Sequence, residues 1–446
     1  MRASEAYREY FCESSLRCLF FERVLGGHAV GLDRITPLRF ADDIDREIAI
    51  VLRKVGNSSY QFTPYRLLLS SKGKGCIPRE LNIPTVRDRL VLAALSQVLD
   101  DVYGIACRTC QPQLVVERVR ECVESGRYAQ CLKIDIRRFY SSIPHDKLMR
   151  TIRKRIRKKE VLRLIEDAIR TPSSPIGEKA SEQRDEGVPE GLSISNRLAN
   201  IFVESIDAAF AGDSGVSYFR YVDDILLFCS DDEAKIAKSK LNGAISKLGL
   251  TINEEKTHLV NLRSDSLDYL GYIFEPSGCL TVRSSTVKRL EKTLDDKLRK
   301  MRGIVDHVSP LQHINNRITG CRITEDGVNF ERYGWLHYYS RIDDIGLLCR
   351  LDSLIRKLID RYDLPIQQDT KSFKKAYYEI KYKANRTKYI PTYDMNAPKE
   401  VKLRDLKLLF PSERWDDLDD TMINLLYSRR IRSMANQLEK DLGLIS

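Results

Sequence analysis

The chain has 446 residues, of which 42% are hydrophobic and 31% are charged, a composition typical of globular proteins. Its length excludes a single compact core and predicts about two to four domains. The net charge of +11 favours a polyanionic partner, because each neutralised phosphate releases counterions, although a basic surface kept for solubility gives the same number. No apolar stretch approaches a membrane span, and the N-terminus lacks the basic-then-apolar order of a signal peptide. We therefore expect a cytoplasmic protein without a membrane partner.

Eleven cysteines are scattered along the chain without regular spacing. An odd number without a pattern argues against a disulfide framework, so we expect reduced thiols. Cys107 and Cys110 have the spacing of zinc ligands, but their candidate partners Cys122 and Cys131 form no second close pair. A structural zinc site is therefore the less favoured reading of these cysteines.

The first elements in chain order are helical. Residues 1–60 are predicted to form helices, because apolar residues recur at helical spacing between Phe40 and Leu52. Residues 61–89 carry the Pro and Gly punctuation of strands and loops, and a helical pattern returns over 88–102.

A strand is predicted over 130–136, and Pro144 then opens a helix whose apolar residues recur every four positions up to Ile156. Within this predicted helical region, residues 147–163 carry nine basic residues against the single acid Glu160, which favours phosphate contact over a merely solvated face. The candidate nucleic-acid contacts are Arg153, Lys154, Arg157 and Lys158.

The rest of the chain alternates between loops and helices. Residues 172–191 are loop-like, and helices are predicted over 193–210 and 232–248. From about Val282 the pattern is helical and basic, and residues 370–404 are rich in Lys and Tyr.

Asp223 and Asp224 lie inside an apolar run, residues 218–228, that predicts two short strands meeting at a tight turn. Adjacent carboxylates repel each other and resist burial, and a divalent cation offsets that cost. Oxygen ligands favour Mg²⁺ or Mn²⁺ over zinc. A solvated turn is the alternative, since the chain has seven other Asp-Asp pairs; one of them, Asp343-Asp344, precedes a helical pattern and is expected near a helix start.

A two-metal phosphoryl-transfer site needs carboxylates from more than one strand, because two ions about 3.5–4 Å apart clamp the attacking and leaving oxygens. Asp135 ends the predicted strand 130–136 and is the natural second source. The order is then a strand with Asp, a Gly-rich loop with a helix, and the paired-Asp hairpin.

This order resembles that of reverse transcriptases. Segments similar to their four palm motifs and their primer grip follow one another along the chain: residues 133–140, 187–196, 221–224, 248–257 and 269–272. Residues 79–89, 31–36 and 333–339 resemble the fingers, the N-terminal extension and a thumb motif of group II intron-type enzymes. The likeness covers about residues 30–345.

The resemblance implies an α+β, right-hand polymerase fold with a basic C-terminal addition. Its expected parts are an N-terminal helical extension, fingers that include parts of 145–185, a palm with an antiparallel sheet, a helical thumb and a helical RNA-binding region: residues 1–60, 61–130, 131–280, 281–345 and 346–446.

The resemblance also implies roles for single residues. Asp135 and Asp223 would hold two Mg²⁺ ions, or Mn²⁺, with support from Asp224 and the backbone carbonyl of Ile136. The ions would lower the pKa of the primer 3′-hydroxyl and neutralise charge on the α-phosphate. Lys256 would protonate the leaving pyrophosphate, with a plain surface lysine as the alternative.

Nucleotide and primer contacts follow from the same resemblance. Arg79 and Lys72, with Lys74 as its competitor, would grip the triphosphate of a dNTP. Tyr140 would lie under the sugar and exclude a 2′-hydroxyl, or simply pack in the core. The remaining nucleotide and primer-grip residues would be Glu190, Gly191, Leu270, Gly271 and Tyr272.

Three departures from the pattern help to place the chain. Glu190 stands where most relatives have Gln, Asn196 stands where intron enzymes carry Pro, and the sequence ends without the Cys/His cluster of an intron endonuclease. Residues 190–196 and 388–394 are most similar to bacterial antiviral-defence reverse transcriptases. That likeness implies a structured non-coding RNA as template and partner, docked on the basic C-terminal region, and a cDNA product.

Two other functions stay open. A maturase-like RNA-binding scaffold with an idle polymerase site is one, although such a scaffold does not need the aspartates, Lys72 and Arg79 together. Template-independent or protein-primed DNA synthesis is the other, because ionised Glu190 accepts hydrogen bonds but cannot donate them as Gln does.

Overall fold

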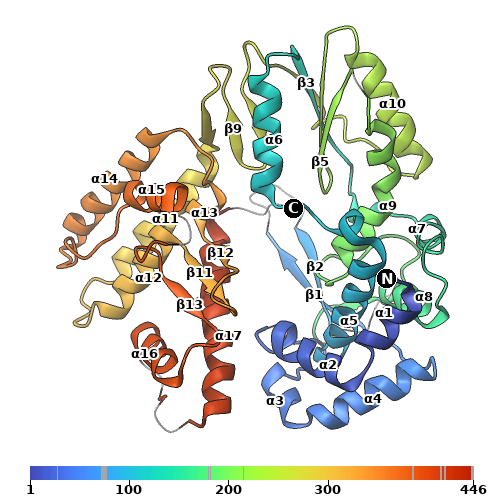
Figure 1. The fold of residues 1–446 in the computed structure, drawn as a ribbon, viewed down its shortest axis with the longest axis horizontal. Helices are drawn as coiled ribbons and strands as arrows, with labels where there is room; N and C mark the ends of the chain where they lie inside the picture. Colours follow the sequence, from blue (N-terminus) through green and yellow to red (C-terminus); the bar gives the residue numbers. More distant parts are fainter. Residues whose placement is uncertain are drawn as a thin grey trace. The chain divides into compact units, whose positions relative to one another are not determined.

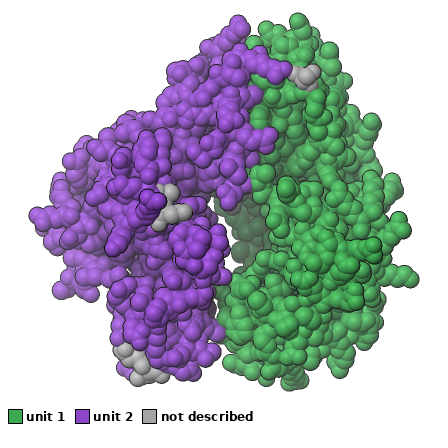
Figure 2. Space-filling view, viewed as in Figure 1, with its two compact units in different colours: residues 1–110, 128–260 green, residues 111–127, 261–446 purple. Residues whose placement is uncertain are grey.

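The computed structural model describes residues 1–442 except 28, 72–77, 179, 181, 214, 384–385, 412–413 and 416–417. The chain forms two compact units, each built from two separate stretches (Figure 2). Unit 1 comprises Met1–Cys110 and Tyr128–Val260, and unit 2 comprises Gln111–Arg127 and Asn261–Ser446. The five-part division expected from the sequence stays a prediction.

Unit 1 begins with the predicted helices. They are α1 (Ala3–Tyr10), α2 (Glu13–Leu19), the π-helical turn η1 (Phe20–Val24), α3 (Pro37–Asp42) and α4 (Ile44–Gly56) (Figure 1). Phe40, Ile44, Ile48 and Val51 are buried, as the helical spacing predicts.

A small sheet and a long helix follow. Strands β1 (Tyr65–Ser70) and β2 (Arg79–Ile83) pair antiparallel, and β4 (Ser173–Ser174) adds to β1 in parallel. Helix α5 (Val86–Tyr103) starts at Thr85, whose hydroxyl oxygen accepts a hydrogen bond from the backbone N–H of Asp88 at 3.2 Å.

The stretch Val86–Glu124 has the length and mean hydropathy of a membrane span, which the sequence analysis did not anticipate. However, 67% of its most apolar window is buried inside the protein. Packing in a protein core accounts for that composition equally well.

The central sheet of unit 1 has the strand order β5-β6-β3-β7. Its strands are β3 (Gln130–Asp135), β5 (Ser217–Tyr221), β6 (Asp224–Cys229) and β7 (His258–Asn261). Helix α10 (Ala234–Lys247) packs against β3 and β6, and α9 (Ser195–Phe210) packs against β5 (Figure 1). Two further helices, α7 (His145–Ile152) and α8 (Lys159–Arg170), follow β3 in the chain.

Unit 2 contains two three-stranded sheets and most of the C-terminal helices. The first sheet, β10-β9-β8, joins β8 (Leu267–Tyr269), β9 (Tyr272–Phe274) and β10 (Leu280–Val282), and α6 (Pro112–Glu124) packs on β9. The helices are α11 (Ser284–Lys300), α12 (Val308–Thr319), α13 (Trp335–Tyr338), α14 (Ile345–Tyr362), α15 (Phe373–Lys383), α16 (Lys399–Leu409) and α17 (Asp420–Leu438).

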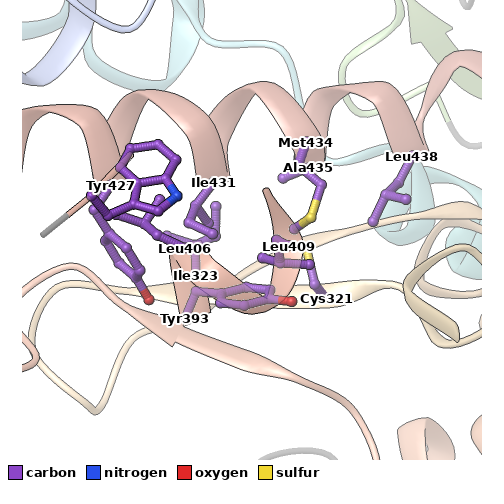
Figure 3. Packing of buried hydrophobic residues seen from close by; sticks show 11 residues of the cluster. Cys321, Ile323, Tyr393, Leu406, Leu409, Tyr427, Ile431, Met434, Ala435 and Leu438 are labelled. Carbon is purple, nitrogen blue, oxygen red and sulfur yellow. The ribbon is translucent and has the colours of Figure 1, made fainter. Parts of the chain in front are cut away.

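The helical pattern from about Val282 did not predict the second sheet, which lies in this part of the chain. Strand β11 (Cys321–Thr324) pairs antiparallel with β12 (Glu331–Tyr333) and in parallel with β13 (Thr392–Asp394). Helix α17 turns Tyr427, Ile431 and Leu438 onto this sheet (Figure 3). These short strands are stabilised by that apolar cluster, which no local pattern of three or four residues predicts.

Candidate active site

Strand pairing brings the three predicted aspartates together where the inner strands β3 and β6 of the central sheet end, and we call this end the sheet edge. Asp135, the last residue of β3, lies directly across from Asp224, the first residue of β6. Asp223 occupies the turn between β5 and β6, and its backbone oxygen accepts a hydrogen bond from Ile136 N–H at 3.3 Å. The predicted hairpin is therefore confirmed. The three carboxylates come from the end of β3, the start of β6 and the turn before β6.

The turn that carries Asp223 is held in an unusual conformation. Val222 has a φ of +57°, a left-handed conformation that a β-branched side chain rarely adopts, and its side chain is buried. Arg220 donates a hydrogen bond to the Val222 carbonyl oxygen at 3.1 Å. The same guanidinium donates to both carboxylate oxygens of Asp207 on α9, at 2.8 and 2.6 Å. This clamp fixes the turn, and no local sequence pattern predicts it.

The other Asp-Asp pair that resembled this one has a plain structural role. Asp344 is the N-cap of α14, and its carboxylate accepts a hydrogen bond from Leu347 N–H at 2.7 Å. The predicted position of Asp343-Asp344 near a helix start is confirmed.

Negative charge is crowded at the sheet edge. Burial, followed by the charges of Asp223 and Asp135, raises the pKa of Asp224 to about 6, although Lys133 and Lys256 act in the opposite direction. A carboxyl group that ionises this reluctantly has a strong affinity for a nearby cation.

Asp135 is held by the loop that precedes β7. Asn253 donates its side-chain amide to one carboxylate oxygen of Asp135 at 3.1 Å and its backbone N–H to the Asp135 carbonyl oxygen at 2.8 Å. The ammonium group of Lys256 lies 3.3 Å from the same carboxylate and is largely exposed. Asn253 was missed, because a lone Asn in a loop gives no sequence signal for this contact.

The three aspartates offer the oxygen donors that Mg²⁺ prefers. Within the described residues, no group of three or more His, Cys, Asp or Glu side chains is already arranged to hold a metal ion. The donor chemistry and the raised pKa of Asp224 fit a divalent cation. The metal-ligand roles, including that of the Ile136 carbonyl, stay predictions.

Arg79 and Glu190, two of the predicted nucleotide residues, lie close enough to Tyr140 to act on it electrostatically. The Tyr140 hydroxyl donates a hydrogen bond to the Asn196 side-chain oxygen at 2.6 Å. Burial, then the charges of Asp223 and Glu190, raise the pKa of Tyr140 well above its ordinary value, and Arg79 opposes them. Arg79 and Glu190 form an ion pair at 3.0 Å.

Of the other nucleotide candidates, the structure describes Gly191. Gly191 has a φ of +105°, and a Cβ there would lie 2.7 Å from the backbone oxygen of Asn82, so no larger residue fits. Lys72 and Lys74 lie outside the described residues.

The predicted continuous basic helix after Pro144 is wrong. Helix α7 ends at Ile152 and α8 begins at Lys159, because Ile156 is buried in the connecting turn and the apolar stripe of α8 has a different phase. Arg153 pairs with Glu166 at 3.5 Å and Lys158 with Glu160 at 2.8 Å, which leaves less free charge than the sequence suggested. Lys154 and Arg157 lie in the same turn, and phosphate contact by these four residues stays a prediction.

The predicted primer-grip residues form the turn between β8 and β9 in unit 2. Leu270 and Gly271 both have positive φ, +51° and +81°, and Tyr272 is fully buried. The Leu270 carbonyl oxygen accepts a hydrogen bond from the Tyr338 hydroxyl at 3.0 Å. The turn is thus anchored on α13, and its role as a primer grip stays a prediction.

Residues 74–274 match the family described as "Reverse transcriptase (RNA-dependent DNA polymerase)". This segment is a reverse transcriptase domain. It contains Arg79, Tyr140, Glu190 and the three aspartates, and it confirms the expected α+β, right-hand polymerase fold.

The chain is also similar in sequence to two curated proteins and in structure to a solved telomerase. It is 22% identical to a COX1/OXI3 intron 1 protein of Saccharomyces cerevisiae, over 58% of this chain and 39% of that protein. It is 24% identical to Protein YkfC of Escherichia coli, over 55% of this chain and 76% of that protein. A solved telomerase from Candida albicans, in complex with a fragment of telomeric RNA, is 14% identical with a TM-score of 0.42, over 91% of this chain and 66% of that one. The chain thus spans well under half of the yeast protein and about three quarters of the bacterial one.

Proposed function

We propose that the protein is an RNA-directed DNA polymerase that extends a primer with dNTPs on an RNA template. The observation that carries this proposal is the meeting of Asp135, Asp223 and Asp224 at one edge of the β3–β6 sheet within a reverse transcriptase domain. Two Mg²⁺ ions bound there would activate the primer 3′-hydroxyl and neutralise charge on the α-phosphate. Mn²⁺ has the same ligand preference.

The residues around the aspartates have complementary roles in this proposal. Asn253 orients the Asp135 carboxylate, and the Arg220 clamp holds the turn of Asp223. The hydrogen bond to Asn196 fixes the Tyr140 ring, so that the ring can select the sugar. Lys256 stands at the edge of the site with an exposed ammonium group that can deliver a proton.

An RNA partner is supported by a surface on α15. Tyr378 and Tyr382 are 52% and 65% exposed, and their rings lie 5.0 Å apart. Residues 371–390 carry seven basic residues against the single acid Glu379. Exposed aromatic rings among cations suit the stacking of unpaired bases and phosphate contact, as single-stranded RNA offers.

The finer proposal is a dedicated, structured non-coding RNA as template, in a cytoplasmic bacterial antiviral-defence system. Its support is the likeness of residues 190–196 and 388–394 to defence-associated enzymes. The basic surface of α15 is consistent with a structured RNA but does not select one RNA from another.

The test uses the purified protein with the RNA that co-purifies, incubated with dNTPs and Mg²⁺, and sequencing of any DNA product. We expect DNA complementary to that RNA from the wild type, none from Asp223→Asn, and normal yield from Asp232→Asn, an exposed matched control. No DNA from the wild type would favour the maturase-like scaffold. DNA made after RNase treatment, or covalently attached to the protein, would favour template-independent or protein-primed synthesis. Equal DNA from Asp223→Asn contradicts the proposed site.

A further inference from the structure

The ion pair between Arg79 and Glu190 joins the residue expected to grip the triphosphate to the residue that departs most clearly from the reverse transcriptase pattern. Oε2 of Glu190 lies 3.0 Å from Nε of Arg79, and the two side chains are 31% and 13% exposed. The Nε–H of Arg79 is not aligned as a hydrogen-bond donor, so the attraction is that of an ion pair. A carboxylate of the protein itself therefore compensates the charge of Arg79.

The backbone on both sides of this pair is fixed. Asn82 donates its backbone N–H to the Glu190 carbonyl oxygen at 2.7 Å and its side-chain amide to the same oxygen at 3.0 Å. The side-chain oxygen of Asn82 accepts a hydrogen bond from Arg184 at 2.9 Å. Gly191 allows this close approach, because a Cβ there would collide with the Asn82 backbone. The loop of Glu190 is thus bound to strand β2, on which Arg79 lies.

A fixed loop leaves only the side chains free to respond to a ligand. A triphosphate that binds Arg79 competes with Glu190 for the charge of the guanidinium, and the Glu190 carboxylate then faces further negative charge. Glutamine at this position would carry no charge, so it would compete less strongly for Arg79 and would not repel a phosphate.

We propose that Glu190 is a specificity-determining residue that competes with the nucleotide triphosphate for Arg79 and so sets a high threshold for dNTP binding. This inference rests on the proposed polymerase function. Nucleotide binding then exchanges one ion pair for another instead of creating a new one. Exchange predicts a weak dependence of binding on salt, because the number of screened pairs changes little.

The test measures dTTP incorporation on poly(rA) primed with oligo(dT), with KM and kcat determined separately at several salt concentrations. Glu190→Gln is expected to lower the KM for dTTP about fivefold, the fold-change that corresponds to loss of one partly exposed competing ion pair of about 1 kcal/mol. The change falls on KM rather than on kcat. The KM of the variant is also expected to rise more steeply between about 50 and 200 mM salt than that of the wild type.

Matched variants separate this inference from other causes. Glu186→Gln removes an exposed carboxylate from the same loop and is expected to leave the KM for dTTP unchanged. In an Arg79→Gln background, Glu190→Gln should no longer lower KM, because the competing partner is gone. An unchanged or higher KM in Glu190→Gln, or a decrease that persists without Arg79, would overturn the inference. Failure of the polymerase proposal gives a different result, namely no incorporation by the wild type above that of Asp223→Asn.

Discussion

Because the carboxylates of the site are crowded, we expect Asp224→Asn to increase the stability of the fold and to abolish DNA synthesis. Asp224 is half-buried and lies directly across the sheet from Asp135. Its pKa is raised from 3.8 to about 6, by burial first and then by its two acidic neighbours. Each pKa unit is worth about 1.4 kcal/mol, so ionised Asp224 destabilises the metal-free fold by about 3 kcal/mol.

The pH dependence has a definite sign. A carboxyl group with a raised pKa favours folding in its neutral form, so the destabilisation is absent below about pH 4 and complete above about pH 6. Asparagine is neutral throughout. Asp224→Asn should therefore be more stable than the wild type by about 3 kcal/mol at about pH 8, with the difference vanishing toward about pH 4.

The assay is urea unfolding in EDTA and in saturating MgCl₂ over this pH range, together with DNA synthesis. Asp224→Asn is expected to lose synthesis and to gain less stability from Mg²⁺ than the wild type does, since a ligand that binds only the folded state stabilises it. Asp232→Asn serves as the exposed control with no expected change. If Asp224→Asn is no more stable than the wild type in EDTA at about pH 8, the reasoning from crowded charge is refuted.

Three further predictions concern other residues. Tyr140→Phe keeps the ring and should retain selection of dNTPs over rNTPs, whereas Tyr140→Ala should lose at least about tenfold of it; equal selectivity in both variants argues against a sugar gate. The pKa of His337 is lowered to about 3, by burial first and then by nearby arginines, so the neutral ring contributes stability that is lost as the pH falls from about 6.5 toward 3. At about pH 5 the loss is about 2 kcal/mol, and urea unfolding of His337→Phe should lack this pH dependence. The same pH dependence in the wild type and in His337→Phe would contradict the prediction. Lys256→Ala should lower kcat about a hundredfold if Lys256 is the proton donor, and an unchanged kcat would leave it a plain contact of Asp135.

Local pattern predicted the parts of the site that local physics controls. The strand ending at Asp135 and the hairpin of Asp223 and Asp224 follow from apolar runs that end at charged residues, and the structure has both. Antiparallel pairing then requires the acidic ends of β3 and β6 to meet.

Choice of partner between distant segments could not be predicted in this way. Asp207 on α9 binds Arg220, and Glu190 binds Arg79, although nothing near those residues in the sequence indicates the pairing. The basic run after Pro144 shows the same limit, because burial of Ile156 ends the helix against the local charge pattern.

The two charged parts of the site differ in how their charge is compensated. At the sheet edge, the carboxylates of Asp135, Asp223 and Asp224 are crowded, and burial with the charges of its two neighbours raises the pKa of Asp224. At the loop, Arg79 already has an anionic partner in Glu190. A magnesium–triphosphate complex would bring a divalent cation to the crowded aspartates and an anion of higher charge to Arg79 in a single binding event. We therefore expect Mg²⁺ and dNTP to bind cooperatively, with a coupling that weakens in Asp224→Asn.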